Sequence, residues 1–189
     1  MRNLLFACVV IFVGFHSNSF ASSPNADVDG QILQYASKNI RDKLLKHPNL
    51  VHEATLYLTS CRLQSSKDDI DYCRYNRIRF LVEYVDAFYN HITAQENVAF
   101  DLAGDGGTSM PMPGIWPNHV QSCAWRLAIL GSGGPGVGSD DETFARGDCS
   151  GLSVALRHVA EARAAAIARE IRKHLADGSS AVSMDDTYK

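Results

Sequence analysis

Four cysteines have a type and spacing that indicate a definite chemistry: Cys61, Cys73, Cys123 and Cys149. The fifth cysteine of the sequence, Cys8, lies in the expected secretion signal described below, so its removal leaves an even number. An even number of cysteines in an exported chain favours two disulfide bonds. Three pairings are possible, and we favour the sequential one, Cys61–Cys73 with Cys123–Cys149, because each pair brackets a plausible local connection. The sequence has no C-x2-C spacing, which argues against a zinc site and against paired reactive thiols. We therefore predict disulfides, and no metal or other cofactor.

The remaining residues that could do chemistry do not form a catalytic pattern. His47 and His52 are five residues apart, which does not align two ligands on one helical face. The chain has neither H-E-x-x-H nor G-x-S-x-G. The carboxylates of 68–71 and 140–142 stand at expected helix starts, where capping explains them. We predict that the protein is not an enzyme; the alternative, a hydrolase using Asp and His, lacks a nucleophile or metal motif.

Three further patterns predict ordinary features. Arg74, Arg77 and Arg79 form a small basic cluster, which is typical of a solvated helix face. The segment 25–36 resembles the front half of a calcium loop but has Ala36 where such a loop has its Glu. The glycines of 131–138 lack the Lys-Ser/Thr of a phosphate loop and predict a connector.

The first 21 residues predict a secretion signal. Leu4–Phe15 is a nearly unbroken apolar run that follows a positive start and is too short to span a bilayer. Ser19 and Ala21 are the small residues that a signal peptidase reads, so we place cleavage after Ala21. The alternative is an uncleaved membrane anchor. Cleavage would remove Arg2 and no acid, which changes the formal net charge from −3 to −4. A periplasmic or secreted location follows.

The composition is that of a globular domain. The chain has 189 residues, of which 46% are hydrophobic, 9% aromatic and 21% charged. This is enough to close one core, and it excludes a disordered acidic tail. The near-neutral charge also excludes a basic nucleic-acid arm, so we expect no nucleic-acid partner.

The elements that position these residues are expected to be helices. Apolar residues step by three and four along the chain, and no convincing period-two alternation is present. Pro48 is expected to stop the first helix, and no Gly or Pro interrupts the chain from Lys67 to Ala103. The expected helices cover 27–44, 49–58, 67–103, 118–130 and 141–175. The predicted fold class is all-α, a small disulfide-stapled helical bundle.

One irregular segment, Ala103–Pro117, carries a large apolar loop cluster. Its members are Met110, Met112, Ile115 and Trp116. Loops on a rigid frame commonly carry recognition, and Trp is a frequent anchor in interfaces. We predict that this cluster contacts a protein partner. The alternative is that Ile115 and Trp116 fold back onto the core.

The cysteine frame resembles the LprI-type lysozyme-inhibitor family. Cys61 and Cys73 open a helix that contains Asp86 and Tyr89. The family's order then continues with Trp116, Cys123, a Gly-rich gap, Cys149 and Arg157. His119 and Gln121 stand where the family has an Arg-Asp pair. The resemblance implies a four-cysteine exported helical domain over 61–176. It leaves 22–60 as an N-terminal helical extension and 177–189 as a polar tail.

The resemblance also implies a function. Members of this family that have an assigned role block lysozyme by protein–protein contact, so we expect an exported periplasmic binding or inhibitory protein. The expected partner is a lysozyme or other muramidase, with no membrane contact after signal cleavage. Two alternatives remain open: an immunity protein against a peptidoglycan-targeting toxin, and a structural envelope protein without catalytic activity.

Overall fold

A computed structural model describes residues 31–64, 66–104, 112–134 and 136–177. This part of the chain is helical, and it contains an isolated bridge between Leu58 and Ile115 but no β-strand. The predicted all-α fold class is confirmed. The helices are α2 (Lys38–Leu44), α3 (Pro48–Thr55), η1 (Cys61–Leu63), α4 (Lys67–Ala87), α5 (Ile92–Ala103), α6 (His119–Ser132), α7 (Ser139–Ser150) and α8 (Val154–Ala176). None of the described helices is both long and apolar enough to cross a bilayer.

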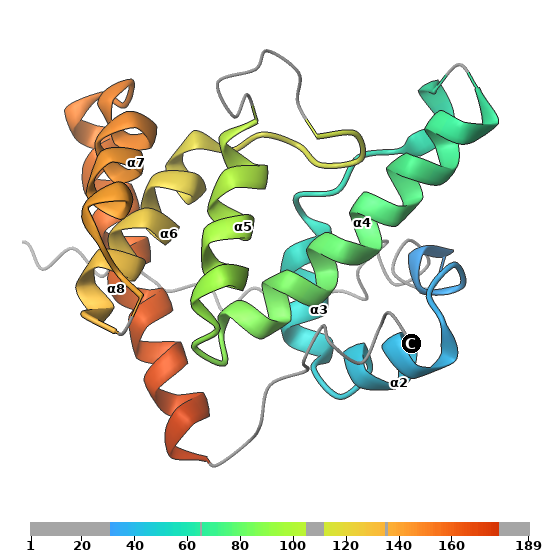
Figure 1. The fold of residues 1–189 in the computed structure, drawn as a ribbon, viewed down its shortest axis with the longest axis horizontal. Helices are drawn as coiled ribbons and strands as arrows, with labels where there is room; N and C mark the ends of the chain where they lie inside the picture. The colour runs from blue at the N-terminus through green and yellow to red at the C-terminus, as the bar shows by residue number, and fades with distance from the viewer. Residues whose placement is uncertain (1–30, 65, 105–111, 135, 178–189) are drawn as a thin grey trace, which may run out of the picture.

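The helices form a bundle around α6. Helix α6 packs against α5, α7 and α8, while α4 packs against α5 on one side and α2 and α3 on the other (Figure 1). The core has an aromatic centre in which Trp125 meets Tyr84 and Phe88, with ring centroids 5.9 and 5.1 Å apart. The buried cluster extends from Ile32 to Ile171, so helices from both ends of the described chain share one core.

The predicted starts of three helices are confirmed. Ser66 caps α4 and accepts a hydrogen bond from the Asp69 amide at 3.1 Å. Asn118 caps α6, and the acidic residues 140–142 occupy the first turn of α7. Such side chains satisfy backbone N–H groups that have no partner inside the helix.

The prediction of one uninterrupted helix over 67–103 is wrong. Helix α4 ends at Ala87, and the chain reverses through Asn90, whose φ is 64°, before α5 begins. Asn tolerates this left-handed conformation better than most residues. The reversal lets α4 and α5 bury their apolar faces against each other, and buried Gln95 holds the turn by donating to the Ala87 carbonyl at 3.0 Å.

The single helices expected over 27–44 and 141–175 are also interrupted. Ser37 caps a separate α2, and Ser153 caps a separate α8 by accepting from the Leu156 amide. A capping Ser competes with helix continuation, and Gly151 beside it weakens the helix further. Pro48 occupies the first turn of α3 and therefore starts a helix as well as ending the previous one.

Both predicted disulfides are present. Cys61 is bonded to Cys73 with their Cα atoms 5.8 Å apart, and Cys123 is bonded to Cys149 with a Cα separation of 5.0 Å. The first bond joins η1 to α4, and the second joins α6 to α7. Each bridge therefore fixes a helix to the element that precedes or follows it in the chain.

Candidate functional site

Residues 112–118, called here the Trp116 segment, form the described end of the irregular region before α6. They run beside α4 and then across the C-terminal end of α5 (Figure 1). The Trp116 amide donates to the Tyr57 carbonyl at 2.7 Å, and the Thr59 amide donates to the Gly114 carbonyl at 2.9 Å. Asn118 donates its amide to the Leu102 carbonyl at 2.7 Å. The segment is thus held by backbone hydrogen bonds at both ends.

Gly114 allows the Trp116 segment to lie close to α4. Its φ of 92° is in the left-handed region, where a side chain is strained. A Cβ at this position would lie 2.7 Å from Cγ of Arg77 and 2.9 Å from the Cys73 carbonyl oxygen. The segment therefore rests on the helix turn that the Cys61–Cys73 disulfide fixes.

The predicted contact residues do not share one environment. Met110 lies outside the described residues. Ile115 is 3% exposed and belongs to the core, as in the alternative in which it folds back onto the core. Met112 is half-buried against the core, with its Sδ 3.9 Å from the Tyr72 hydroxyl. Trp116 is 65% exposed. The segment therefore separates an inward Ile from an outward Trp.

A buried ionic network fixes the frame beneath this segment. Arg79 on α4 donates from Nη2 to both carboxylate oxygens of Asp101, at 2.9 and 2.7 Å, and from Nη1 to Glu83 at 2.6 Å. Asn97 donates to the other Glu83 oxygen at 3.0 Å. Burial raises the pKa of the Glu83 carboxyl, and the Arg79 guanidinium opposes that rise. The network locks α4 to α5, and α5 carries the Leu102 carbonyl that holds Asn118.

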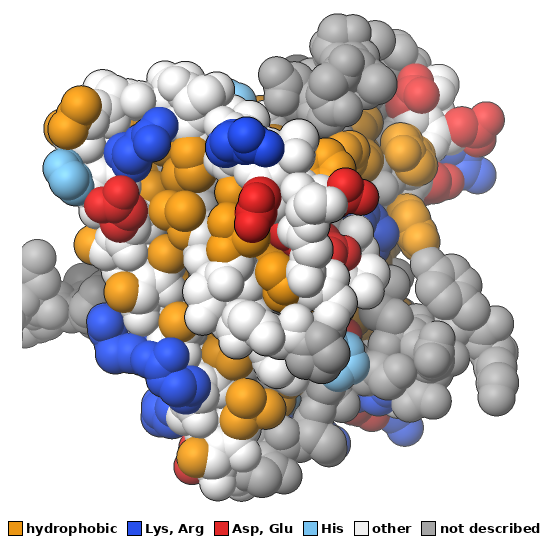
Figure 2. Space-filling view, turned by 60° about the vertical axis from the view of Figure 1, so that its left-hand side comes forward, with side chains coloured by type: hydrophobic (Ala, Val, Ile, Leu, Met, Phe, Trp, Pro, Cys, Tyr) orange, Lys and Arg blue, Asp and Glu red, His pale blue; other side chains and the backbone are white. Residues whose placement is uncertain are grey.

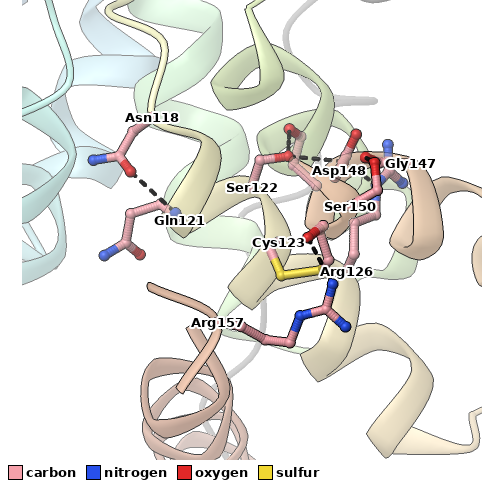
Figure 3. The surroundings of a disulfide bond; sticks show 11 residues. Asn118, Gln121, Ser122, Cys123, Arg126, Gly147, Asp148, Ser150 and Arg157 are labelled. Atoms are coloured by element: carbon pink, nitrogen blue, oxygen red, sulfur yellow. Dashed lines mark hydrogen bonds and ion pairs between the residues drawn. A yellow bond between two sulfur atoms is a disulfide. The ribbon is translucent and has the colours of Figure 1, made fainter. Parts of the chain in front are cut away.

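The second disulfide lies in a separate polar cluster (Figure 3). Ser122, next to Cys123, donates to the Ala99 carbonyl and lies 2.8 Å from the Asp148 carboxylate. Arg126 donates from Nε to the same carboxylate at 3.1 Å, and Arg157 donates to the Cys149 carbonyl at 3.0 Å. These contacts tie α5, α6, α7 and α8 together, which is a structural role.

The side chains of His47 and His174 contact Tyr89 in the described part of the chain. Among the described residues, no three His, Cys, Asp or Glu side chains are placed to hold a metal ion. His47 lies 2.9 Å from the Tyr89 hydroxyl, and the ring of His174 stacks on Tyr89 at 4.8 Å. Burial, His174 and Lys46 all lower the pKa of His47. This cluster closes the contact between α3, α4 and α8.

The predicted solvated face of Arg74, Arg77 and Arg79 is corrected in part. Arg79 is turned toward α5 and is mostly buried in the network with Asp101. Arg74 and Arg77 instead line a cavity together with Arg62. The reason is helical geometry: positions 74 and 77 share a face of α4, and position 79 points elsewhere.

Other exposed apolar side chains lie on α7 and α8. Phe144, Val154 and Val159 are more than half exposed. Figure 2, which brings this side of the bundle forward, shows hydrophobic side chains interspersed with polar and charged ones. Arg126 covers the Phe144 ring at 4.9 Å. Trp116 differs from these residues because it lies outside the helices, in the Trp116 segment.

Sequence reasoning missed the partners that hold the site. Tyr57 and Thr59 hold the Trp116 segment through backbone atoms. Every residue type has these atoms, so the sequence does not reveal the contact. The Arg79–Asp101 pair does leave a signal, since Asp101 is a lone acid within the apolar run that ends α5.

Comparison with family models, characterised proteins and solved structures finds no match to this chain.

Proposed function

We propose that the protein is an exported binding module that blocks a cell-wall-degrading enzyme, with a lysozyme or another muramidase as the target. The resemblance of the cysteine frame to LprI-type inhibitors is the basis for the target class. The two disulfides support the exported location, because such bonds persist in oxidising compartments.

The observation that carries the binding role is Trp116. A large aromatic side chain that is 65% exposed on a backbone held by hydrogen bonds loses little conformational entropy on docking. Trp residues at the centre of an interface contribute disproportionately to affinity. The half-buried Met112, beside Tyr72 on α4, extends the apolar surface next to the held segment.

Charge supports the encounter. The formal net charge, −3 for the full sequence and −4 after removal of residues 1–21, would attract a basic lysozyme, and this attraction raises the association rate more than the affinity. The association rate constant should therefore be higher at low salt than at high salt, whereas the dissociation rate constant should change less.

The proposed function is tested by immobilising the oxidised protein and measuring lysozyme binding by interferometry, together with lysis of a cell-wall suspension. We expect saturable binding and slower lysis in proportion to the protein added. Binding without slower lysis would contradict inhibition but support a binding module. No binding by any muramidase of a panel would contradict the proposed target class.

A further inference from the structure

A second feature is a cavity of about 340 Å³ between the start of the described chain and α4. Three arginines line it: Arg62, Arg74 and Arg77. Its other polar lining residues are Gln31, Gln34, Tyr35, Thr59 and Ser60. None of its described lining residues is Asp or Glu.

The Cys61–Cys73 disulfide brings these cations together. An arginine directly follows each of the two bonded cysteines, as Arg62 and Arg74. Arg77 lies three residues beyond Arg74 on the same face of α4. The bond therefore places Arg62 of η1 at the same cavity as Arg74 and Arg77 of α4.

Arg74 has partners within the chain, including the Tyr35 hydroxyl at 3.3 Å, whereas a buried donor of Arg77 has none among the described residues. Arg74 pairs with Asp71 at 3.1 Å, an exposed contact, and its guanidinium stacks on the Tyr35 ring at 4.2 Å. The Nε of Arg77 is buried and has no hydrogen-bond partner within the described part of the chain. Burial lowers the pKa of Arg77, so its charge carries a desolvation cost. Buried donors of this kind are normally satisfied, which points to an acceptor that enters the cavity.

We propose that this cavity binds a compact oxyanion, a phosphate or carboxylate group, held by Arg62, Arg74 and Arg77. Guanidinium groups present fixed N–H forks that match both kinds of anion. The hydroxyls of Thr59 and Ser60 can donate to the same ligand, and the Tyr35 ring can cover an attached ring or chain. The volume limits the ligand to a small molecule or to one group of a larger one.

The test is an NMR titration of the oxidised, 15N-labelled protein with inorganic phosphate and, separately, with acetate, at pH 7 and constant ionic strength maintained with chloride. The arginine Nε–H signals report the cavity directly. We expect saturable shifts at Arg77 and at the cavity wall with at least one of the two anions. Tighter phosphate binding would assign a phosphate-bearing ligand, and tighter acetate binding a carboxylate-bearing one.

Variants separate a site from general charge attraction. Arg62→Gln, at an exposed position, should weaken binding about tenfold, since a charge-assisted hydrogen bond is lost. Arg77→Met keeps the packed stem beside Gly114 and should abolish the saturable phase. Arg172→Gln, an exposed arginine on α8, is the control and should bind as the native protein does. Linear shifts without saturation, or equal losses in Arg62→Gln and Arg172→Gln, would overturn the proposal.

Discussion

The Trp116 amide donates a 2.7 Å hydrogen bond to the Tyr57 carbonyl, although the Trp116 side chain is itself 65% exposed. The adjacent Ile115 is 3% exposed and forms the bridge to Leu58. Successive side chains in extended backbone point to opposite sides, so burial of Ile115 turns Trp116 outward. The exposure of Trp116 is therefore fixed by its neighbours in sequence and space.

Gly114→Ala should destabilise the protein by about 2 kcal/mol or more, because alanine is strained at positive φ and overpacks the site. The added Cβ would fall 2.9 Å from the Cys73 carbonyl oxygen. The free energy of unfolding in urea measures the change. Gly147→Ala, in α7 with nothing near the new Cβ, is the matched control and should stabilise by about 0.5 kcal/mol. Equal effects at the two positions would refute the close contact with α4.

Asp101→Asn should cost about 3 kcal/mol, because it removes one of the two carboxylates that pair with the mostly buried Arg79 guanidinium. Asp71→Asn removes the carboxylate of the exposed pair with Arg74 and should cost under about 1 kcal/mol. Chemical denaturation of both variants measures the difference. A loss at Asp101 no larger than that at Asp71 would show that the network does not hold α4 to α5.

The two disulfides should contribute similarly to stability but differently to partner binding. Replacing either cysteine pair with serines should lower the free energy of unfolding by about 3 kcal/mol in the chain-entropy model. Loss of Cys61–Cys73 should also weaken partner binding, because Gly114 rests on Cys73. Loss of Cys123–Cys149 should leave the affinity of the folded protein nearly unchanged. Equal losses of affinity would mean that the Trp116 segment does not depend on the first bridge.

Acidification should destabilise the contact around His47. Its pKa is lowered below the ordinary 6.5, chiefly by burial and then by His174 and Lys46. The unfolded chain therefore takes up a proton at a higher pH than the folded one, so this stabilising contribution is present above about pH 6.5 and is lost as the pH falls through the lowered pKa. Unfolding should be measured at several pH values from 7.5 downward.

His47→Gln should reduce this dependence on pH, while His158→Gln, whose side chain is exposed on α8, serves as the control for loss of an imidazole. A native-like pH dependence in His47→Gln would assign the effect to other groups.

The sequence predicted those features that are set by local chemistry. Ser66 and Asn118 indicate helix starts, because the side-chain oxygen of each caps the first turn of a helix. The cysteine spacing indicated the two disulfides between cysteines near in sequence. The reversal at Asn90 was not predicted, because it depends on the burial of α4 against α5 and not on any Gly or Pro.

The sequence predicted which segment forms the candidate site, but not which of its side chains are buried and which are exposed. Met112, Ile115 and Trp116 have similar apolar character, so the sequence could not say which of them faces outward. That choice is made by backbone hydrogen bonds of the segment with the Tyr57 carbonyl and the Thr59 amide, more than fifty positions away. The sequence likewise did not predict that Arg62 lines the same cavity as Arg74 and Arg77, because this depends on the disulfide that joins η1 to α4.

The central claim is that Trp116 anchors a protein partner, and the most direct test is the affinity of Trp116→Ala for a muramidase that the native protein binds, measured by interferometry. Phe144→Ala, another exposed aromatic position, is the control, and thermal unfolding should show that both variants remain folded. We predict that Trp116→Ala weakens binding about tenfold or more while Phe144→Ala does not. A folded Trp116→Ala protein that binds as tightly as the native one would contradict the proposed role of Trp116 as an anchor.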